Sequence, residues 1–436
     1  MIMNRLIVFL ALCCLTFVCS AQEFKVMTQE IVQLLEQNKM GKVHSYFDKK
    51  TKKSFKKIYL IAAWRGIQKN NGKLRDVGEV AYSSAKNRQT ATVPLHFEKA
   101  SFNLVLTGNE KKEIAGLRFT ALAYQTPPWA KNRVFGKERI KVKTDTFTLP
   151  GELLLPESCN QCPVVILVHG SGPSDRNEGS SLTPNRLFQD LAYGFAINGI
   201  ATIRYDKRTL VYQKQLTGID SFTLYDETIA DAVTAVNLAK SYPFLDSSAV
   251  YVLGHSLGAY ASPRIANKSD VAGIIMLAGP YRPLYEIIPE QYAFLLGLDG
   301  KLTKKETKLI ETTKEEVKFI NKEKSTVSKL SVMGNDQMLH YFRDLSRYDP
   351  ADMIKQLDCR VLVTQGDRDY QVRYQTEFIK YQDILQHESH VDFYLIPGVN
   401  HQLIWGSAPS TPNEYYIPGH PSLDVIKYLA GWVNHK

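Results

Sequence analysis

Cysteine is scarce in this sequence, which has six cysteines among 436 residues. Three of them fall within the first 19 residues, so Cys159, Cys162 and Cys359 are left in the rest of the chain. A zinc site at Cys159 and Cys162 would need a second ligand pair nearby, and the sequence provides none. A redox pair usually opens a helix, whereas this pair stands in a turn before an apolar run. We therefore predict a small disulfide loop and no metal site.

Long apolar runs are absent after the first 21 residues, as are internal repeats and low-complexity tracts. Residues 1–21 have the pattern of a secretory signal peptide, with Arg5, an apolar stretch and then small residues. The apolar stretch is too short for an ordinary membrane span. Lipid attachment is the weaker alternative, because neither Cys14 nor Cys19 follows a small residue. The sequence thus predicts a secreted or periplasmic protein without a transmembrane segment.

Acidic residues are few in the N-terminal part. Residues 22–130 carry 19 Lys and Arg against 9 Asp and Glu, whereas residues 131–436 carry 34 against 35. The net charge of +10 is therefore concentrated near the N-terminus, most densely at residues 49–57. A basic face can attract anionic polymers or membrane surfaces, although a solvated surface is the simpler interpretation. Nucleic acid is not an expected partner of an exported protein.

The order of predicted elements divides the mature chain into two domains. Residues 22–125 contain helical patterns followed by short strands, which predicts a small basic α+β domain. Prolines stiffen residues 126–136, which we predict to be a linker. Residues 137–436 alternate apolar strands with amphipathic helices, the pattern of a mostly parallel sheet with helices on both faces.

This second domain begins with extended chain at residues 137–155, interrupted by a predicted turn at residues 149–152. Six further strands are predicted from their apolar runs: Val164–Val168, Ile200–Tyr205, Val250–Leu253, Gly273–Leu277, Arg360–Thr364 and Phe393–Ile396. The alternation stops at residues 283–350, where helical patterns follow one another. Because an insertion between strands lies outside the sheet, we predict a helical lid over the C-terminal strand ends.

The segment Gly254-His255-Ser256-Leu257-Gly258 has the G-x-S-x-G pattern of a nucleophile elbow. It follows a short apolar strand and opens a helical stretch, which is the setting that this motif requires. Glycines are needed at both ends because side chains there would collide with neighbouring backbone. The sequence therefore predicts that Ser256 is a nucleophile.

Two further motifs carry a family resemblance. Residues 169–177 read HGSGPSDRN, and residues 204–208 read RYDKR. Together with the elbow, they resemble the bacterial esterases of the α/β-hydrolase superfamily, over roughly residues 137–436. Thr209 departs from the pattern, because related sequences commonly have glycine there. The resemblance implies the α/β-hydrolase fold, and a carboxylesterase that acts mostly on short acyl groups without metal or organic cofactor.

The resemblance also implies a catalytic triad in the order serine, acid, histidine. The acid lies after the strand at 360–364, where it favours Asp369, with Asp367 as the alternative. The histidine lies in a loop after the last strand, which makes His401 the general base that accepts the Ser256 proton. His387, His390 and His420 are expected to be surface residues, and His255 to point away from the nucleophile.

An oxyanion hole is expected beside Ser256. The helix that starts at Leu257 directs its amide toward the oxyanion, and the resemblance assigns the second amide to Ser171. We expect the remaining motif residues to support the site, some of them as a charge-paired network. These supporting residues are His169, Gly170, Asp175, Arg176, Asp206 and Arg208.

The predicted function is ester hydrolysis through an acyl-enzyme, with a small-molecule or acylated-glycan ester as substrate. A serine peptidase or an acyltransferase with the same triad is the nearest alternative. A non-catalytic protein that binds glycans or anionic polymers through its basic domain is the alternative of another class. Nothing in the sequence indicates an oligomeric state.

Overall fold

The computed structural model describes residues 22–85, 88–111, 113–144, 146–179, 183–407 and 409–435. The predicted signal peptide, residues 1–21, lies outside the described residues. The chain forms two compact units, and the first extends to Gln125 and includes two short segments that end at Asn185 and Gly419. Among the described residues, no helix is both long enough and apolar enough to span a membrane.

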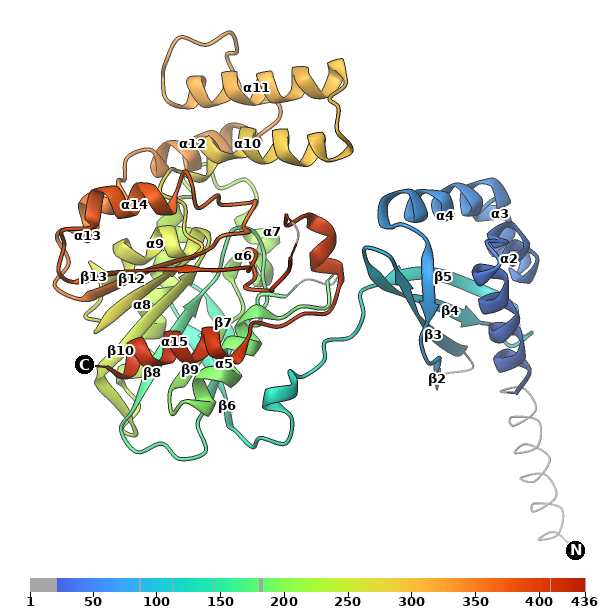
Figure 1. The fold of residues 1–436 in the computed structure, drawn as a ribbon, viewed down its shortest axis with the longest axis horizontal. Helices are drawn as coiled ribbons and strands as arrows, with labels where there is room; N and C mark the ends of the chain where they lie inside the picture. Colours follow the sequence, from blue (N-terminus) through green and yellow to red (C-terminus); the bar gives the residue numbers. More distant parts are fainter. Residues whose placement is uncertain are drawn as a thin grey trace, which may run out of the picture. The chain divides into compact units, whose positions relative to one another are not determined.

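The N-terminal unit packs helices on an antiparallel sheet (Figure 1). Helical residues 22–36 precede α2 (Met40–Val43), η1 (His44–Tyr46), α3 (Lys49–Ser54) and α4 (Lys57–Asn71). The strands are β1 (Leu74–Val77), β2 (Ala81–Ala85), β3 (Arg88–Phe97), β4 (Ser101–Gly108) and β5 (Ile114–Thr120), in the order β1-β3-β4-β5 with β2 paired to β3. Alternate residues of β3 are buried, because one face of the sheet packs on helical side chains such as Trp64.

The second unit, which begins at Thr126, is built on an eight-stranded sheet in the order β13-β12-β11-β10-β8-β9-β7-β6. Its strands are β6 (Gly136–Lys143), β7 (Thr148–Leu155), β8 (Cys162–Val168), β9 (Ala201–Tyr205), β10 (Leu245–His255), β11 (Gly273–Leu277), β12 (Arg360–Gly366) and β13 (Val391–Ile396). β7 is antiparallel to β6 and β9, and the pairs from β9 through β13 are parallel. The predicted strands are present, most of them with longer bounds.

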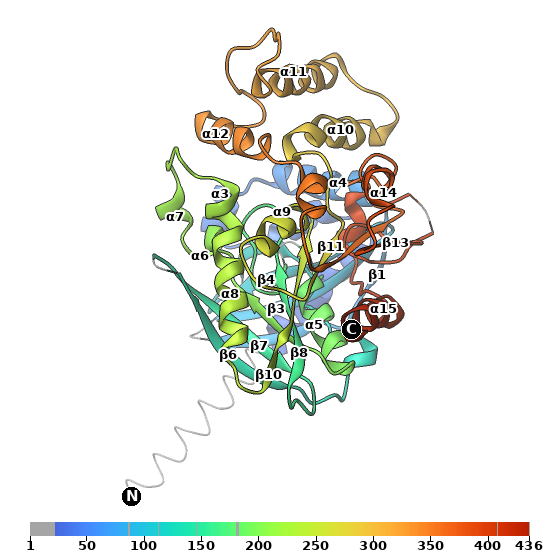
Figure 2. The same ribbon diagram turned by 90° about the vertical axis from the view of Figure 1, so that its left-hand side faces the viewer.

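Helices cover both faces of this sheet (Figures 1 and 2). Alternate residues of β8 enter different cores: Val165 and Leu167 pack with α5 (Leu187–Ile197) and α15 (Leu423–Asn434). Val164 and Ile166 belong to the opposite core. That core contains residues of α8 (Ala230–Lys240), α9 (Leu257–Ala266) and α14 (Phe378–Leu385). The central strands are thus apolar on both faces, which explains why they appear as continuous apolar runs.

One helix begins irregularly. The turn η3 (Tyr225–Ile229) is a π-helix that leads directly into α8. A π-helix holds one residue more per turn than an α-helix, and such turns are often found at functional sites. Its residue Glu227 is buried.

The insertion between β11 and β12 is helical. It contains α10 (Leu284–Leu296), η4 (Gly297–Asp299), α11 (Lys304–Ile320), α12 (Asp336–Leu345) and α13 (Pro350–Ile354). Figures 1 and 2 show α10, α11 and α12 beyond one end of the sheet strands. Side chains of α10 and α12 line a cavity with residues that follow β8 and β10, so these helices lie at the C-terminal strand ends.

The predicted turn at residues 149–152 is wrong, because Pro150 and Gly151 lie inside β7. The chain turns earlier, where the Thr144 amide donates to the Phe147 carbonyl at 2.9 Å. A side chain at Gly151 would place its Cβ 2.8 Å from the Arg204 carbonyl oxygen. The glycine therefore permits close packing of β7 on β9 and does not mark a turn.

The connections complete the second unit. The short helices η2 (Pro128–Ala130), α6 (Arg208–Val211) and α7 (Gln213–Leu216) lie in its loops, and η5 (Pro412–Tyr416) lies in a segment grouped with the first unit. The predicted disulfide is present between Cys159 and Cys162, and Cys162 is the first residue of β8. Cys359 is a free, half-buried thiol, and burial raises its pKa to about 11.

Candidate active site

Ser256 lies at a sharp turn between β10 and α9. Its backbone angles are φ 55° and ψ −116°, a strained conformation for a residue with a side chain. The Ser256 amide donates to the Leu277 carbonyl at 2.9 Å, which ties the turn to β11. Cβ atoms at Gly254 and Gly258 would each lie 2.2 Å from a backbone oxygen, of Gly258 and Val168 respectively. The turn can therefore form only with glycine at both positions.

Asp369 and His401 meet in the loops after β12 and β13. His401 Nδ1 lies 2.5 Å from Asp369 Oδ2, and both side chains are buried. The other carboxylate oxygen of Asp369 accepts hydrogen bonds from the amides of Gln371 and Val372, at 2.8 and 3.0 Å. Gln365 Nε2 donates to Oδ2 at 2.8 Å. These contacts fix the carboxylate and, through it, the orientation of the imidazole.

Asp367, the alternative acid, has a different partner. Its Oδ1 accepts a hydrogen bond from the Gly398 amide at 2.7 Å, and Arg368 Nη1 donates to the Gly398 carbonyl at 3.2 Å. Asp367 thus holds the turn that precedes His401. Of the two carboxylates that the sequence offered, Asp369 is the one that contacts the histidine.

The amides of Ser171 and Leu257 lie close to Ser256. A Cβ at Gly170, the residue before Ser171, would lie 3.2 Å from Ser256 Cβ, so this backbone runs close to the elbow. Within the part of the chain that the structure describes, no hydrogen bond from either amide to a protein acceptor is found. Both residues line the same cavity.

His255 holds the elbow and the histidine loop together, a role that the sequence did not indicate. Its Nε2 lies 2.9 Å from the His401 carbonyl oxygen, and its Nδ1 lies 3.0 Å from Glu178 Oε2, at an angle that is poor for a hydrogen bond. Burial lowers the pKa of His255, but the Glu178 carboxylate outweighs it and leaves the pKa raised. Glu178 Oε1 also accepts from the Gly170 amide at 2.7 Å.

Glu178 was missed because nothing local marks it. It stands one residue beyond the HGSGPSDRN run, and its partner His255 is distant in sequence. Burial raises the pKa of this carboxyl, but the neighbouring His255 and the hydrogen bond from the Gly170 amide lower it by more, so the pKa is depressed overall. Glu178 and His255 therefore make a close contact at the base of the site, with little of either side chain exposed.

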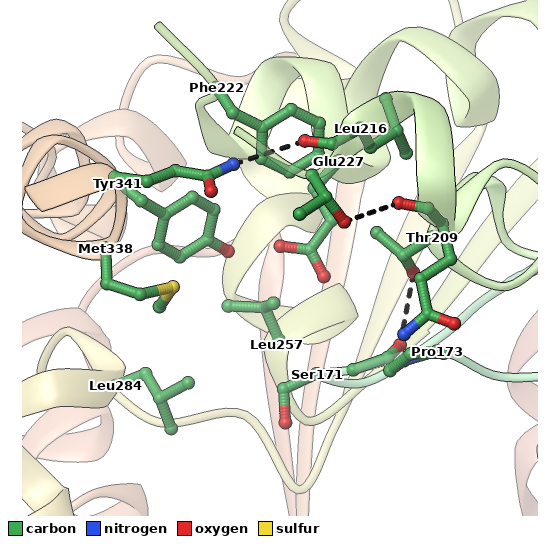
Figure 3. A pocket seen from close by; sticks show the side chains of 14 residues that line it. Ser171, Pro173, Thr209, Leu216, Phe222, Glu227, Leu257, Leu284, Met338 and Tyr341 are labelled. Atoms are coloured by element: carbon green, nitrogen blue, oxygen red, sulfur yellow. Dashed lines mark hydrogen bonds between the residues drawn. The ribbon is translucent and has the colours of Figure 1, made fainter. Parts of the chain in front are cut away.

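A second missed pair lies at the cavity. Lys207 Nζ donates to the Gly170 carbonyl at 2.7 Å and also to the Glu227 carboxylate. Lys207 is 2% exposed and Glu227 is 7% exposed. In Figure 3 the Glu227 carboxylate and the Tyr341 hydroxyl point toward each other into the cavity. Lys207 belongs to the RYDKR motif, but Glu227 follows 20 residues later without a motif of its own.

The cavity has a volume of about 320 Å³ and is mostly apolar. Its walls come from the loop after β8, from α6 and α7, from η3, from α9 and from the insertion. Figure 3 shows its labelled lining residues: Ser171, Pro173, Thr209, Leu216, Phe222, Glu227, Leu257, Leu284, Met338 and Tyr341. Thr209, the departure from the family pattern, therefore stands in the cavity wall.

The expected charge pairing is present for three of the supporting residues, in two ion pairs. Arg176 makes a bidentate pair with Asp206, at 2.9 and 2.8 Å. Arg208 pairs with Asp231, which the sequence did not single out, at 2.8 and 2.5 Å. The Asp175 carboxylate accepts from the backbone amides of Asn177 and Gly179, both at 3.0 Å. The partner of Arg208 and the role of Asp175 in a loop turn were not predicted.

The remaining histidines differ in position. His169 is buried, its Nε2 lies 3.0 Å from the Asp175 carbonyl, and burial lowers its pKa to about 4. His387 is exposed, as expected. His390 and His420 are half-buried, and His420 Nδ1 lies 2.8 Å from Asp190 Oδ2. No cluster of potential metal ligands occurs among the described residues.

Comparison with known proteins identifies the class of this chain. Residues 165–412 match the sequence profile of a family described as "Alpha/beta hydrolase family", and residues 28–117 match one described as "Protein of unknown function (DUF3887)". The chain belongs to the alpha/beta hydrolase family, which confirms the predicted fold and the family resemblance.

The chain is 32% identical to Esterase EstD of Thermotoga maritima over 373 residues, which cover 85% of each protein. Together with the family match, this relative identifies the chain as a carboxylic ester hydrolase. Among solved structures, Est1E from Butyrivibrio proteoclasticus is 19% identical, with a TM-score of 0.43 over 68% of this chain and 99% of that one. An acylaminoacyl peptidase of Pyrococcus horikoshii is 13% identical, with a TM-score of 0.46 over 85% of this chain and 57% of that one.

Proposed function

We propose that this protein hydrolyses short-chain acyl esters through a Ser256-His401-Asp369 triad and an acyl-enzyme. The observation that carries the proposal is the buried contact of 2.5 Å between His401 Nδ1 and Asp369 Oδ2, beside a strained serine turn. With Nδ1 occupied by the carboxylate, Nε2 is the nitrogen that is left to accept the serine proton.

The first half of the reaction forms the acyl-enzyme. His401 removes the proton of Ser256 Oγ, and Oγ attacks the carbonyl carbon of the ester. The carbonyl oxygen becomes negatively charged and is stabilised by the amides of Ser171 and Leu257. When the tetrahedral intermediate collapses, the bond to the alcohol oxygen breaks, and His401 returns its proton to the leaving alcohol.

The second half releases the acid. Water takes the place of the alcohol, and His401 accepts one of its protons while the water oxygen attacks the acyl carbon. The second tetrahedral intermediate uses the same two amides. Its collapse frees the carboxylic acid and returns the proton to Ser256. Asp369 keeps its charge throughout and stabilises the imidazolium that forms twice in each cycle.

Substrate size is proposed from the cavity. A volume of about 320 Å³ with mostly apolar walls suits a small acyl or alcohol group and lies at the lower end of ordinary ligand pockets. Leu284 and Met338 of the insertion contribute to these walls. We therefore assign the choice of substrate to the insertion and the cavity floor, with the triad common to all substrates.

Export is part of the proposal. The disulfide between Cys159 and Cys162 supports it, because disulfides persist mainly in oxidising compartments. A short apolar segment with the pattern of a signal peptide precedes the described residues. A secreted or periplasmic location fits both features.

Covalent labelling tests the proposal. A fluorophosphonate probe is expected to react once per chain, and the added mass is expected on the peptide that contains Ser256. The Ser256→Ala protein is expected to fold, to remain unlabelled and to be inactive on p-nitrophenyl acetate. Ser171→Ala is the matched control: it keeps the backbone amide and should keep both labelling and activity. Label on another residue, or activity in Ser256→Ala, would contradict the triad.

A further inference from the structure

The oxyanion loop is held by a buried lysine. The amide nitrogen of Ser171 and the carbonyl oxygen of Gly170 belong to the same peptide group, which is trans. In a trans peptide the C=O and N–H bonds point in opposite directions within one plane. The Lys207 ammonium donates to the Gly170 oxygen at 2.7 Å, so this contact also determines where the Ser171 N–H points.

The same lysine is anchored from its other side. Glu227 accepts a hydrogen bond from Lys207 Nζ, and both side chains are almost fully buried. The Gly170 amide is fixed in turn by Glu178 Oε1 at 2.7 Å. Gly170 is therefore pinned through both its carbonyl and its amide, by two carboxylates and one ammonium group. The positive charge of Lys207 beside the carbonyl oxygen also polarises the peptide group and strengthens its N–H as a hydrogen-bond donor.

We propose that Lys207 is a positioning residue for ester hydrolysis, which aims and polarises the Ser171 amide toward the oxyanion. Glu227 holds the ammonium in place from the cavity wall. This inference rests on the proposed function, because it assumes that the Ser171 amide binds the oxyanion. It explains why a costly buried charge pair stands beside a cavity that is otherwise mostly apolar.

The test is the double variant Lys207→Met/Glu227→Leu, which removes the pair without leaving a buried charge. Because losing an oxyanion donor lowers kcat by about 10²–10³, misaligning one is expected to lower kcat/KM by about 10- to 100-fold. KM should change little, since the oxyanion exists only in the transition state. A trifluoromethyl ketone, which binds as a tetrahedral adduct, should lose the same factor in affinity.

Arg204→Met is the matched control. Arg204 is a buried cation three residues before Lys207, and it pairs with Glu152 and Asn177. Among the described residues, Arg204 makes no hydrogen bond to Gly170. The Arg204→Met variant should therefore retain the kcat/KM and the ketone affinity of the wild type. Unchanged values in a folded Lys207→Met/Glu227→Leu protein would overturn the inference. If Ser256→Ala kept its activity, the proposed function would fail instead.

An independent observation concerns the corner between α3 and α4. All residues from Lys53 to Tyr59 are exposed, including Phe55, Ile58 and Tyr59 with 37%, 67% and 57% exposure. The buried anchors of α4 are Leu60 and Trp64, so the corner side chains are not needed for the core. No Asp or Glu occurs from Lys49 to Arg75, whereas residues 49–57 contain six lysines.

We propose that this corner, defined as residues 49–59, docks on an anionic lipid surface. Lysines surround large apolar side chains there, which is the composition of segments that lie at a membrane interface. The charge complements anionic headgroups, and the three apolar side chains have the size to enter the boundary between headgroups and acyl chains. Esters at such a surface would then be brought to the second unit of the same chain.

Vesicle cosedimentation of the mature chain tests this surface. Binding is expected to phosphatidylcholine vesicles that contain phosphatidylglycerol, to weaken with salt and to be absent without the anionic lipid. Lys53→Gln/Lys56→Gln/Lys57→Gln is expected to weaken it about 100-fold. Phe55→Ser/Ile58→Ser/Tyr59→Ser should weaken it about tenfold.

Val134→Ser, at a residue with 83% exposure in the second unit, is the apolar control and should bind like the wild type. Absence of vesicle binding would overturn the proposal. Equal binding to heparin that does not depend on the three apolar side chains would also overturn it, and would indicate an anionic polymer instead.

Discussion

Replacing Asp369 by asparagine is expected to lower kcat for p-nitrophenyl acetate by about 10⁴-fold, with little change in stability. An asparagine amide can turn its NH₂ group toward His401 Nδ1, which places the imidazole proton on the wrong nitrogen. Nε2 then carries the proton and cannot accept another from Ser256. The neutral amide also fails to stabilise the imidazolium. Steady-state kinetics near neutral pH, with thermal unfolding as a check, measures the effect.

Asp367→Asn is the matched control for this prediction. It makes the same substitution two residues earlier in the chain, where Asp367 Oδ1 accepts a hydrogen bond from the Gly398 amide at 2.7 Å. An asparagine oxygen can accept the same hydrogen bond, so kcat should stay close to that of the wild type. If the two results were exchanged, Asp367 would be the triad acid.

Replacing Gly258 by alanine is expected to destabilise the fold by at least about 4 kcal/mol or to prevent folding. The new Cβ would lie 2.2 Å from the Val168 carbonyl oxygen and 2.6 Å from that of His169. Both oxygens belong to backbone at the end of β8, which cannot move without disturbing the centre of the sheet. Urea unfolding, or the yield of soluble protein when no transition is seen, measures the loss.

Gly431→Ala provides the comparison within the same chain. Gly431 lies inside α15, and a Cβ there would meet no heavy atom within 4 Å. Alanine in a helix is preferred over glycine by about 0.5–1 kcal/mol, so this variant should be slightly more stable than the wild type. Destabilisation at Gly431, or tolerance at Gly258, would contradict the collision argument.

Local features of the sequence were sufficient for the fold and for the sharp turn at Ser256. The elbow at Ser256 is a strand, a turn and a helix in adjacent residues, so its pattern is complete within a short window. The apolar strands can be recognised for the same reason, because each is a short continuous run of apolar residues. The turn predicted at residues 149–152 failed because glycine serves two purposes, and Gly151 serves close packing between strands.

Contacts between distant residues could not be derived in this way. Asp367 and Asp369 differ by two positions, and only the packing of their loop decides which carboxylate reaches His401. Glu178 and Glu227 carry no motif, although each helps to hold Gly170, directly or through Lys207. These contacts form because the sheet brings separate loops together. The loop positions depend on the sequence of the whole second unit, so the contacts could not be predicted from a short segment.

Because the turn at Tyr225–Ile229 is π-helical, the position of Glu227 in the cavity depends on the number of residues in this turn as well as on their types. Each residue of a helix turns the next by about 100°, so deleting one residue here would let the turn rewind as an α-helix and swing Glu227 sideways. Lys207 would lose its anchor although every contacting residue was still encoded. Related esterases that differ by a single residue in this turn could thus have lost or gained the carboxylate in one step, and alignments that hide such a gap would miss the change.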